Sequence, residues 1–169
     1  MTLEHPYLVK ALDDFSPRIG ELVVMMSYTR DTTLWAVHEL TQEQLDARPH
    51  GVTNSIGMLL AHIAAVEAGY QAVTFGHGEE TWDSPALALG EVGQRHIKNH
   101  DLSYYLDELA AVREKTLTEF ARRDDDWLFE KTPFWNDQPA NNYFKWFHVF
   151  EDELNHRGQI RLIRKMLAT

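Results

Sequence analysis

Apolar residues recur at helical spacing in four long segments of the chain, which predicts an all-α protein. These segments are residues 16–40, 54–75, 102–123 and 141–167, the second beginning at Asn54 or Ser55 and the fourth at Asn141 or Asn142. At the first of them, Ser16 is a suitable N-cap and Pro17 occupies the first helical position, where proline is tolerated. No segment alternates apolar and polar residues convincingly enough to predict a strand.

The connections between these helices are long rather than tight. Residues 41–51 form a connector in which Thr41 can start a short turn, and residues 124–126, three aspartates, are interpreted as a solvated loop. Residues 76–101 hold four glycines and a proline, which predicts a long irregular excursion with room for one short helix. Four amphipathic helices of this length predict a single domain, residues 1–169, folded as an up-and-down four-helix bundle of antiparallel helices without a sheet.

Charge and composition exclude several classes of partner and of chemistry. The chain has 169 residues, with 16 Lys and Arg against 26 Asp and Glu, and a net charge of −10, so nucleic acid and anionic membranes are poor partners. It has no Cys, which excludes disulfides and a protein thiol nucleophile and fits a reducing cytoplasm. Residues 1–15 lack a signal-peptide pattern, and the longest apolar stretch, residues 56–66, is too short to span a bilayer. We therefore expect a cytoplasmic protein.

His62 has unusual surroundings, because it lies on or at the edge of the apolar face of the second helix. Leu59 precedes it by three residues, and Val66 follows it by four. Two interpretations are open for such a histidine. It is either a core side chain hydrogen-bonded to a backbone carbonyl or a metal ligand.

The fourth helix carries His148, Asp152 and His156 at intervals of four residues. Residues four apart share a helix face and can chelate one ion, although an Asp–His salt bridge on a solvated face needs no metal. His148 and His156 lie ~12 Å apart along the axis, so one ion cannot take both, and Asp152 is the shared member. With His62 on an opposing helix, this predicts a site in the bundle interior with two nitrogens, one carboxylate and open coordination positions.

Two stretches resemble the DinB-like superfamily, four-helix-bundle metalloproteins that include bacillithiol- and mycothiol-dependent enzymes. They are residues 55–67 (SIGMLLAHIAAVE) and 148–164 (HVFEDELNHRGQIRLIR). The resemblance implies one histidine ligand on helix two and two ligands four residues apart on helix four, the last before an Arg-Gly-Gln run. Residue by residue, these are His62, Asp152 and His156. Most of the superfamily has histidine where this chain has Asp152, and some members like the mycothiol-dependent branch have a carboxylate.

Other polar residues near these positions are candidates for supporting roles. Glu67 and Gln159 are expected to lie behind the ligands and fix the imidazole tautomers, and His148 is expected near the site without binding the ion. Gly158, inside the fourth helix, predicts a close approach of another helix.

The leading hypothesis is a metal-dependent enzyme whose open positions take a small thiol or a water molecule. Two imidazoles and a carboxylate suit zinc or nickel first, then iron or manganese. The resemblance implies transfer of a low-molecular-weight thiol to a small molecule, or a related hydrolysis or isomerisation, and a homodimer. The alternatives are a non-catalytic metal- or ligand-binding bundle and, with least support, an iron-dependent oxygenase. A DNA-repair role has no support in so acidic a chain.

Overall fold

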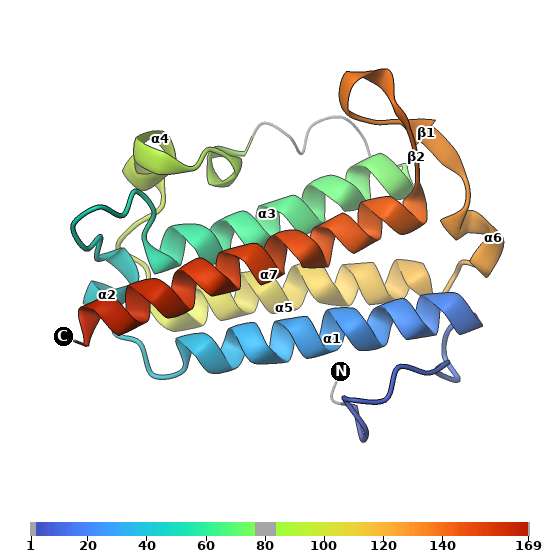
Figure 1. The fold of residues 1–169 in the computed structure, drawn as a ribbon, viewed down its shortest axis with the longest axis horizontal. Helices are drawn as coiled ribbons and strands as arrows, with labels where there is room; N and C mark the ends of the chain where they lie inside the picture. Colours follow the sequence, from blue (N-terminus) through green and yellow to red (C-terminus); the bar gives the residue numbers. More distant parts are fainter. Residues whose placement is uncertain (1–2, 77–83, 169) are drawn as a thin grey trace.

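Four long helices form the body of the protein, and short helices, 3₁₀ turns and a small hairpin connect them at both ends of the bundle (Figure 1). The computed structural model describes residues 3–76 and 84–168. The long helices are α1 (Pro17–Val37), α3 (Ile56–Phe75), α5 (Leu102–Phe120) and α7 (Asn142–Leu167). The all-α four-helix bundle expected from the sequence is confirmed, with helix ends that differ from the expected ones by three residues at most.

The direction of the helices differs from a simple up-and-down order. Contacts between α3 and α5 advance together along both helices: Gly57 faces Tyr105, and Gln71 donates a hydrogen bond to Thr116. Helices α3 and α5 are therefore parallel, and residues 85–96 of the connection before α5 pack beside α3, with Gly93 near Met58 in the first turn of α3. The expectation of strictly alternating helices was wrong at this step, because a connection as long as residues 76–101 can return to the end where α3 began.

The described parts of the connections contain more regular structure than the sequence indicated. Helix α2 (Gln42–Asp46) begins with a capping box between Thr41 and Gln44. It corresponds to the short turn that the sequence predicts after Thr41. Before α5 lie the 3₁₀ turn η2 (Pro85–Leu87) and helix α4 (Gly90–His96). The rest of the predicted excursion, residues 77–83, lies outside the described residues.

A small hairpin between α6 (Asp125–Leu128) and α7 contradicts the expectation of no sheet. Strands β1 (Lys131–Pro133) and β2 (Pro139–Asn141) pair antiparallel, with Thr132 opposite Ala140, and the turn between them contains the 3₁₀ element η3 (Trp135–Asp137). Each strand has three residues, which is too short to show an alternating pattern in the sequence. Each also contains a proline, which has no N–H to donate to the neighbouring strand and is therefore tolerated only at the edge of a sheet.

Helix α3 packs against both α5 and α7 and also contacts α2 and η2. Among the described residues it is the one helix long and apolar enough to cross a membrane by length and composition, since its apolar stretch continues beyond residue 66 to Phe75. However, 72% of its most apolar 18-residue stretch is buried inside the protein. Such burial is typical of the core helix of a globular bundle.

Two of the three aspartates at 124–126, where a solvated loop was expected, cap helices, although Asp124 and Asp126 are exposed. Asp124 accepts a hydrogen bond from Trp127 N and caps α6. Asp125 Oδ1 accepts hydrogen bonds from Ser16 Oγ (2.6 Å) and Arg18 N (2.9 Å), at the start of α1. Ser16 makes no side-chain cap of its own. A carboxylate from 107 residues away thus satisfies the first turn of α1.

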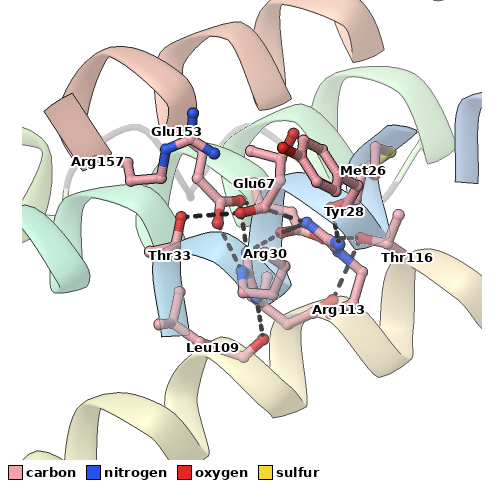
Figure 2. A network of polar contacts seen from close by, with 12 residues as sticks. Met26, Tyr28, Arg30, Thr33, Glu67, Leu109, Arg113, Thr116, Glu153 and Arg157 are labelled. Carbon is pink, nitrogen blue, oxygen red and sulfur yellow. Dashed lines mark hydrogen bonds and ion pairs between the residues drawn. The ribbon is translucent and has the colours of Figure 1, made fainter. Parts of the chain in front are cut away.

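One charged residue from each long helix meets in the middle of the bundle (Figure 2). Arg30 of α1 pairs with Glu153 of α7 (3.0 Å) and Glu67 of α3 (2.9 Å), and Arg113 of α5 pairs with Glu67 (2.8 Å). Arg113 also lies 3.6 Å from Glu153, which closes a ring of four charges that are all less than a tenth exposed. Thr116 adds a hydrogen bond to Glu67 (2.7 Å). The two positive and two negative charges balance.

This ring makes stability depend on pH at the acidic end. Burial by itself would raise the pKa of Glu67, but Arg113 and Arg30 outweigh burial and lower this pKa from 4.5 to about 2. Because the pKa is lower in the folded state, ionised Glu67 stabilises the protein fully above pH 4.5. That contribution is lost as the pH falls toward 2.

We predict that Glu67→Gln lowers the free energy of unfolding by about 3–5 kcal/mol at pH 7, because it leaves two buried arginines with one carboxylate. Urea unfolding of both proteins measures the difference, which should shrink below pH 4 as Glu67 of the original protein takes up a proton. The matched control is Glu108→Gln, an exposed glutamate on α5, which should change stability by no more than about 0.5 kcal/mol. Equal stability of the two variants would contradict the prediction.

Candidate metal centre

Three side chains able to bind a metal meet where α3 and α7 lie side by side (Figure 1). His62 comes from α3, and Asp152 and His156 come from successive turns of α7. One ligand atom of each lies within 4.8 Å of the others. The structure thus brings together the three residues that the sequence analysis combined into one site, and we call them the triad.

The triad is largely shielded from solvent. His62 and His156 are each less than a tenth exposed, and the Asp152 side chain is 20% exposed. Nε2 of His156 lies 3.3 Å from Oδ1 of Asp152, and the two imidazole rings stand edge to face with centroids 4.8 Å apart. The atoms therefore converge from two helices on one small volume, as ligands of a single ion do.

His62 is held in a form suited to metal binding. Its Nδ1 lies 3.0 Å from the carbonyl oxygen of Ala86 in η2, so a proton on Nδ1 is donated to the backbone and Nε2 is left with its lone pair. Burial lowers the pKa of His62, and the nearby His156 adds to this, while the Ala86 carbonyl and Asp152 oppose it. The net lowering favours the neutral imidazole, which is the form that binds metals.

A chain of amide groups supports His156 from behind. The Gly90 amide donates to Asn54 Oδ1 (2.9 Å), Asn54 Nδ2 donates to Gln159 Oε1 (3.4 Å), and Gln159 Nε2 lies 3.2 Å from His156 Nδ1. Gln159 thus contacts a triad imidazole, as the sequence analysis expected. When Nε2 of neutral His156 binds a metal, Nδ1 carries the proton, and Gln159 must turn its amide to present oxygen.

One atom of the triad shows that a cation fits. Asp152 Oδ2 is buried and has no hydrogen-bond partner among the residues that the structure describes. A buried carboxylate oxygen without a partner is costly, and a divalent cation between it and two imidazoles would remove that cost. The donor set of two nitrogens and one carboxylate also leaves coordination positions open, and among the described residues no fourth His, Asp or Glu belongs to the group.

Two expectations about residues near the ligands are wrong. Glu67 uses its hydrogen bonds on Arg30, Arg113 and Thr116, so the expectation that it fixes an imidazole tautomer is corrected. It lies five residues from His62 along α3 and therefore points to another side of the helix. Gly158 has nothing within 4 Å of the position where a Cβ would stand, so the expected close approach does not occur there.

His148 lies beyond the triad on the same helix. Its Nδ1 is 3.0 Å from Glu151 Oε2, and its ring packs edge-on against Trp135 and Tyr70. These contacts agree with a position near the site and outside the set of three ligand atoms.

Sequence reasoning missed Tyr70, a buried residue of α3 whose ring is 5.9 Å from that of His148. Burial raises the pKa of Tyr70, and the negative charge of Asp152 raises it further. The hydroxyl therefore keeps its proton at neutral pH, close to the triad. Its position eight residues after His62, about two turns along the same helix, was the available signal.

Comparison with known proteins agrees with this geometry. The family described as mycothiol-S-transferase matches residues 21–169, a range that contains the whole triad. Among solved structures, a conserved protein from a locus of Enterococcus faecalis has a TM-score of 0.70 at 14% identity, over 86% of this chain and 94% of that one, which is a likeness of fold alone. Curated proteins give no match. The chain belongs to the mycothiol-S-transferase family of DinB-like proteins.

Proposed function

We propose that the protein is a metal-dependent enzyme that joins a low-molecular-weight thiol to an electrophilic small molecule. The observation that carries this proposal is the buried triad with its unpartnered carboxylate oxygen, in a chain that has no Cys of its own. Membership of the mycothiol-S-transferase family supports the choice of a thiol, which must come from a cosubstrate.

In this proposal His62, Asp152 and His156 hold one divalent ion, zinc or nickel by preference and iron or manganese after them. When bound, such an ion lowers the pKa of a thiol that occupies an open position, so that the thiol is deprotonated near neutral pH. Overall, the thiol sulfur forms a bond to the electrophilic carbon. The leaving group departs with its electron pair, and the thiol proton passes to solvent.

The protein's own residues prepare this reaction. The Ala86 carbonyl and Gln159 orient the two imidazoles, so that their Nε2 atoms face Asp152. The aromatic rings of Tyr70, Trp135 and Phe134 pack around His148, one turn before Asp152 on α7. Protonated Tyr70 is a hydrogen-bond donor for a substrate atom that becomes negative during the transfer.

We further propose that the protein works as a cytoplasmic homodimer without nucleic-acid or membrane partners. The acidic charge of −10 and the lack of Cys support the partner and location parts of this proposal. The homodimer follows the habit implied by the DinB-like resemblance.

The ligand set predicts a clear difference among three histidine variants. His62→Ala and His156→Ala should each lower metal affinity by more than about 100-fold, because loss of outer partners alone costs about 10–100-fold. His148→Ala, a matched change on the same helix as His156, should retain near-stoichiometric metal. Elemental analysis after dialysis measures the content, and circular dichroism checks the fold. Full metal content in folded His62→Ala would remove His62 from the set.

Asp152→His should strengthen the binding of zinc or nickel, because it supplies a third imidazole and restores the ligand that most of the superfamily has. Competition with a chromogenic chelator gives the dissociation constants. Asp152→Asn is the control, since it keeps the size of the side chain and removes the charge, and it should weaken binding. A folded Asp152→His protein with weaker zinc binding would show that Asp152 is not a direct ligand.

The thiol reaction predicts a spectroscopic signal. Addition of mycothiol, bacillithiol, glutathione or a simple thiol to cobalt-loaded protein should produce a sulfur-to-metal charge-transfer band. The same thiol should then react faster with an electrophile, and EDTA should abolish the gain. Cobalt-treated His62→Ala is the matched control and should show no band.

If none of these thiols changes the spectrum, thiol transfer is excluded. Faster hydrolysis of an ester by the same loaded protein would then favour the activation of water, and its absence a non-catalytic metal-binding bundle.

A further inference from the structure

Lys145 shares a face of α7 with the triad. It precedes Asp152 by seven residues and His156 by eleven, spacings that return to nearly the same side of a helix. Seven residues correspond to about 10 Å along the helix axis. The amine-bearing side chain therefore starts two turns from the triad, at the end of α7 that the hairpin β1–β2 covers.

The environment of Lys145 is unusual for a cation. Its side chain is fully buried, Nζ donates a hydrogen bond to Thr132 Oγ1 of β1, and Nζ lies 5.9 Å from the centroid of the Phe134 ring. Among the described residues no carboxylate forms an ion pair with it. Burial lowers the pKa of Lys145, and no neighbouring charge opposes this. Thr132 itself is an exposed residue, so the buried amine lies one hydrogen bond from the protein surface.

The other buried cations of the described chain are treated differently. Arg30 and Arg113 both contact Glu67 and Glu153, and their charges are balanced. Lys145 lies in the first turns of α7, where the unsatisfied amides of the helix add positive potential. The burial of the amine, the positive potential at the N-terminus of α7 and the lack of a counter-charge all disfavour the charged form of Lys145. A bound anion would remove all three penalties.

Aromatic side chains connect Lys145 with the triad. The Phe134 ring contacts the amine on one side and has its centroid 6.3 Å from that of Tyr70 on the other. The negative charge of Asp152 in turn raises the pKa of Tyr70, so the two side chains interact electrostatically. Phe134 and Tyr70 therefore form a continuous aromatic contact that leads from the amine toward the triad.

We propose that Lys145, with Thr132, binds an anionic group of the electrophilic substrate, so that the protein selects molecules that carry a carboxylate away from the reacting atom. This inference rests on the proposed function for the position of the reacting atom. The anion site itself rests on the burial, the contacts and the missing counter-charge of Lys145.

The test uses an unreactive pair of probes, 6-succinimidohexanoate and its neutral amide, which differ only in the charged end. Calorimetric titration of the full-length protein, as purified, should show that the acid binds about 10-fold or more tightly than the amide. This preference should decrease as salt is added. Equal affinity for acid and amide, or no binding of either, would overturn the proposal.

Three variants assign the preference to the named residues. Lys145→Met should bind acid and amide equally and unfold at the same or a higher temperature, because it removes a buried charge without a partner. Thr132→Val changes an exposed position and should lose about 2–10-fold of the preference. Lys131→Met removes a charge from the neighbouring exposed position and should keep the full preference. An undiminished preference in Lys145→Met, or in Thr132→Val if Lys145→Met does not fold, would assign the anion elsewhere.

The cobalt–thiol experiment separates this inference from the proposed function. A thiol band in protein without any preference for the acid would leave thiol transfer standing and remove the role of Lys145. Preference for the acid in protein without a thiol band would establish the anion site and overturn thiol transfer.

Discussion

Mutual neutralisation of four buried charges fixes how the helices sit against one another. Each guanidinium of the ring formed by Arg30, Arg113, Glu67 and Glu153 has a rigid donor geometry, so a helix that slides by one turn leaves a charge unpaired. Glu153 follows Asp152 directly in sequence. The same register that closes the ring on one side of α7 therefore aligns Asp152 and His156 with His62 on the other side. The geometry of the candidate metal centre thus depends on a polar core that contains none of the triad residues.

The sequence predicted the triad because its signals are local. A histidine on an apolar helix face and an acid–histidine pair four residues apart can be read within two helices. The partners of Glu67 could not be read in this way, because Arg30 and Arg113 lie 37 and 46 residues from it. Periodicity shows that Glu67 lies off the face of His62, but the choice between an imidazole and two arginines is made by packing.

Topology and the small elements needed information that periodicity does not carry. The long helices were evident, yet nothing in their patterns distinguishes a parallel from an antiparallel neighbour, and only the length of residues 76–101 pointed to a return along the bundle. The hairpin at 131–141 was not predicted because its strands are so short. The hydrogen bond between Lys145 and Thr132 of that hairpin was therefore not predicted either. The residues to which we assign substrate selectivity, Lys145 and Thr132, were thus the ones that the sequence pattern did not bring together.

The cap that Asp125 provides to α1 has a consequence for folding. A helix usually carries its own N-terminal cap, whereas the cap of α1 cannot form until residue 125 has been made. The charge ring adds a second delay, because Arg30 meets Glu153 only when α7 is present. The first helix of the chain is therefore completed by its last third. Such distant dependence slows folding and makes the bundle form as one cooperative unit.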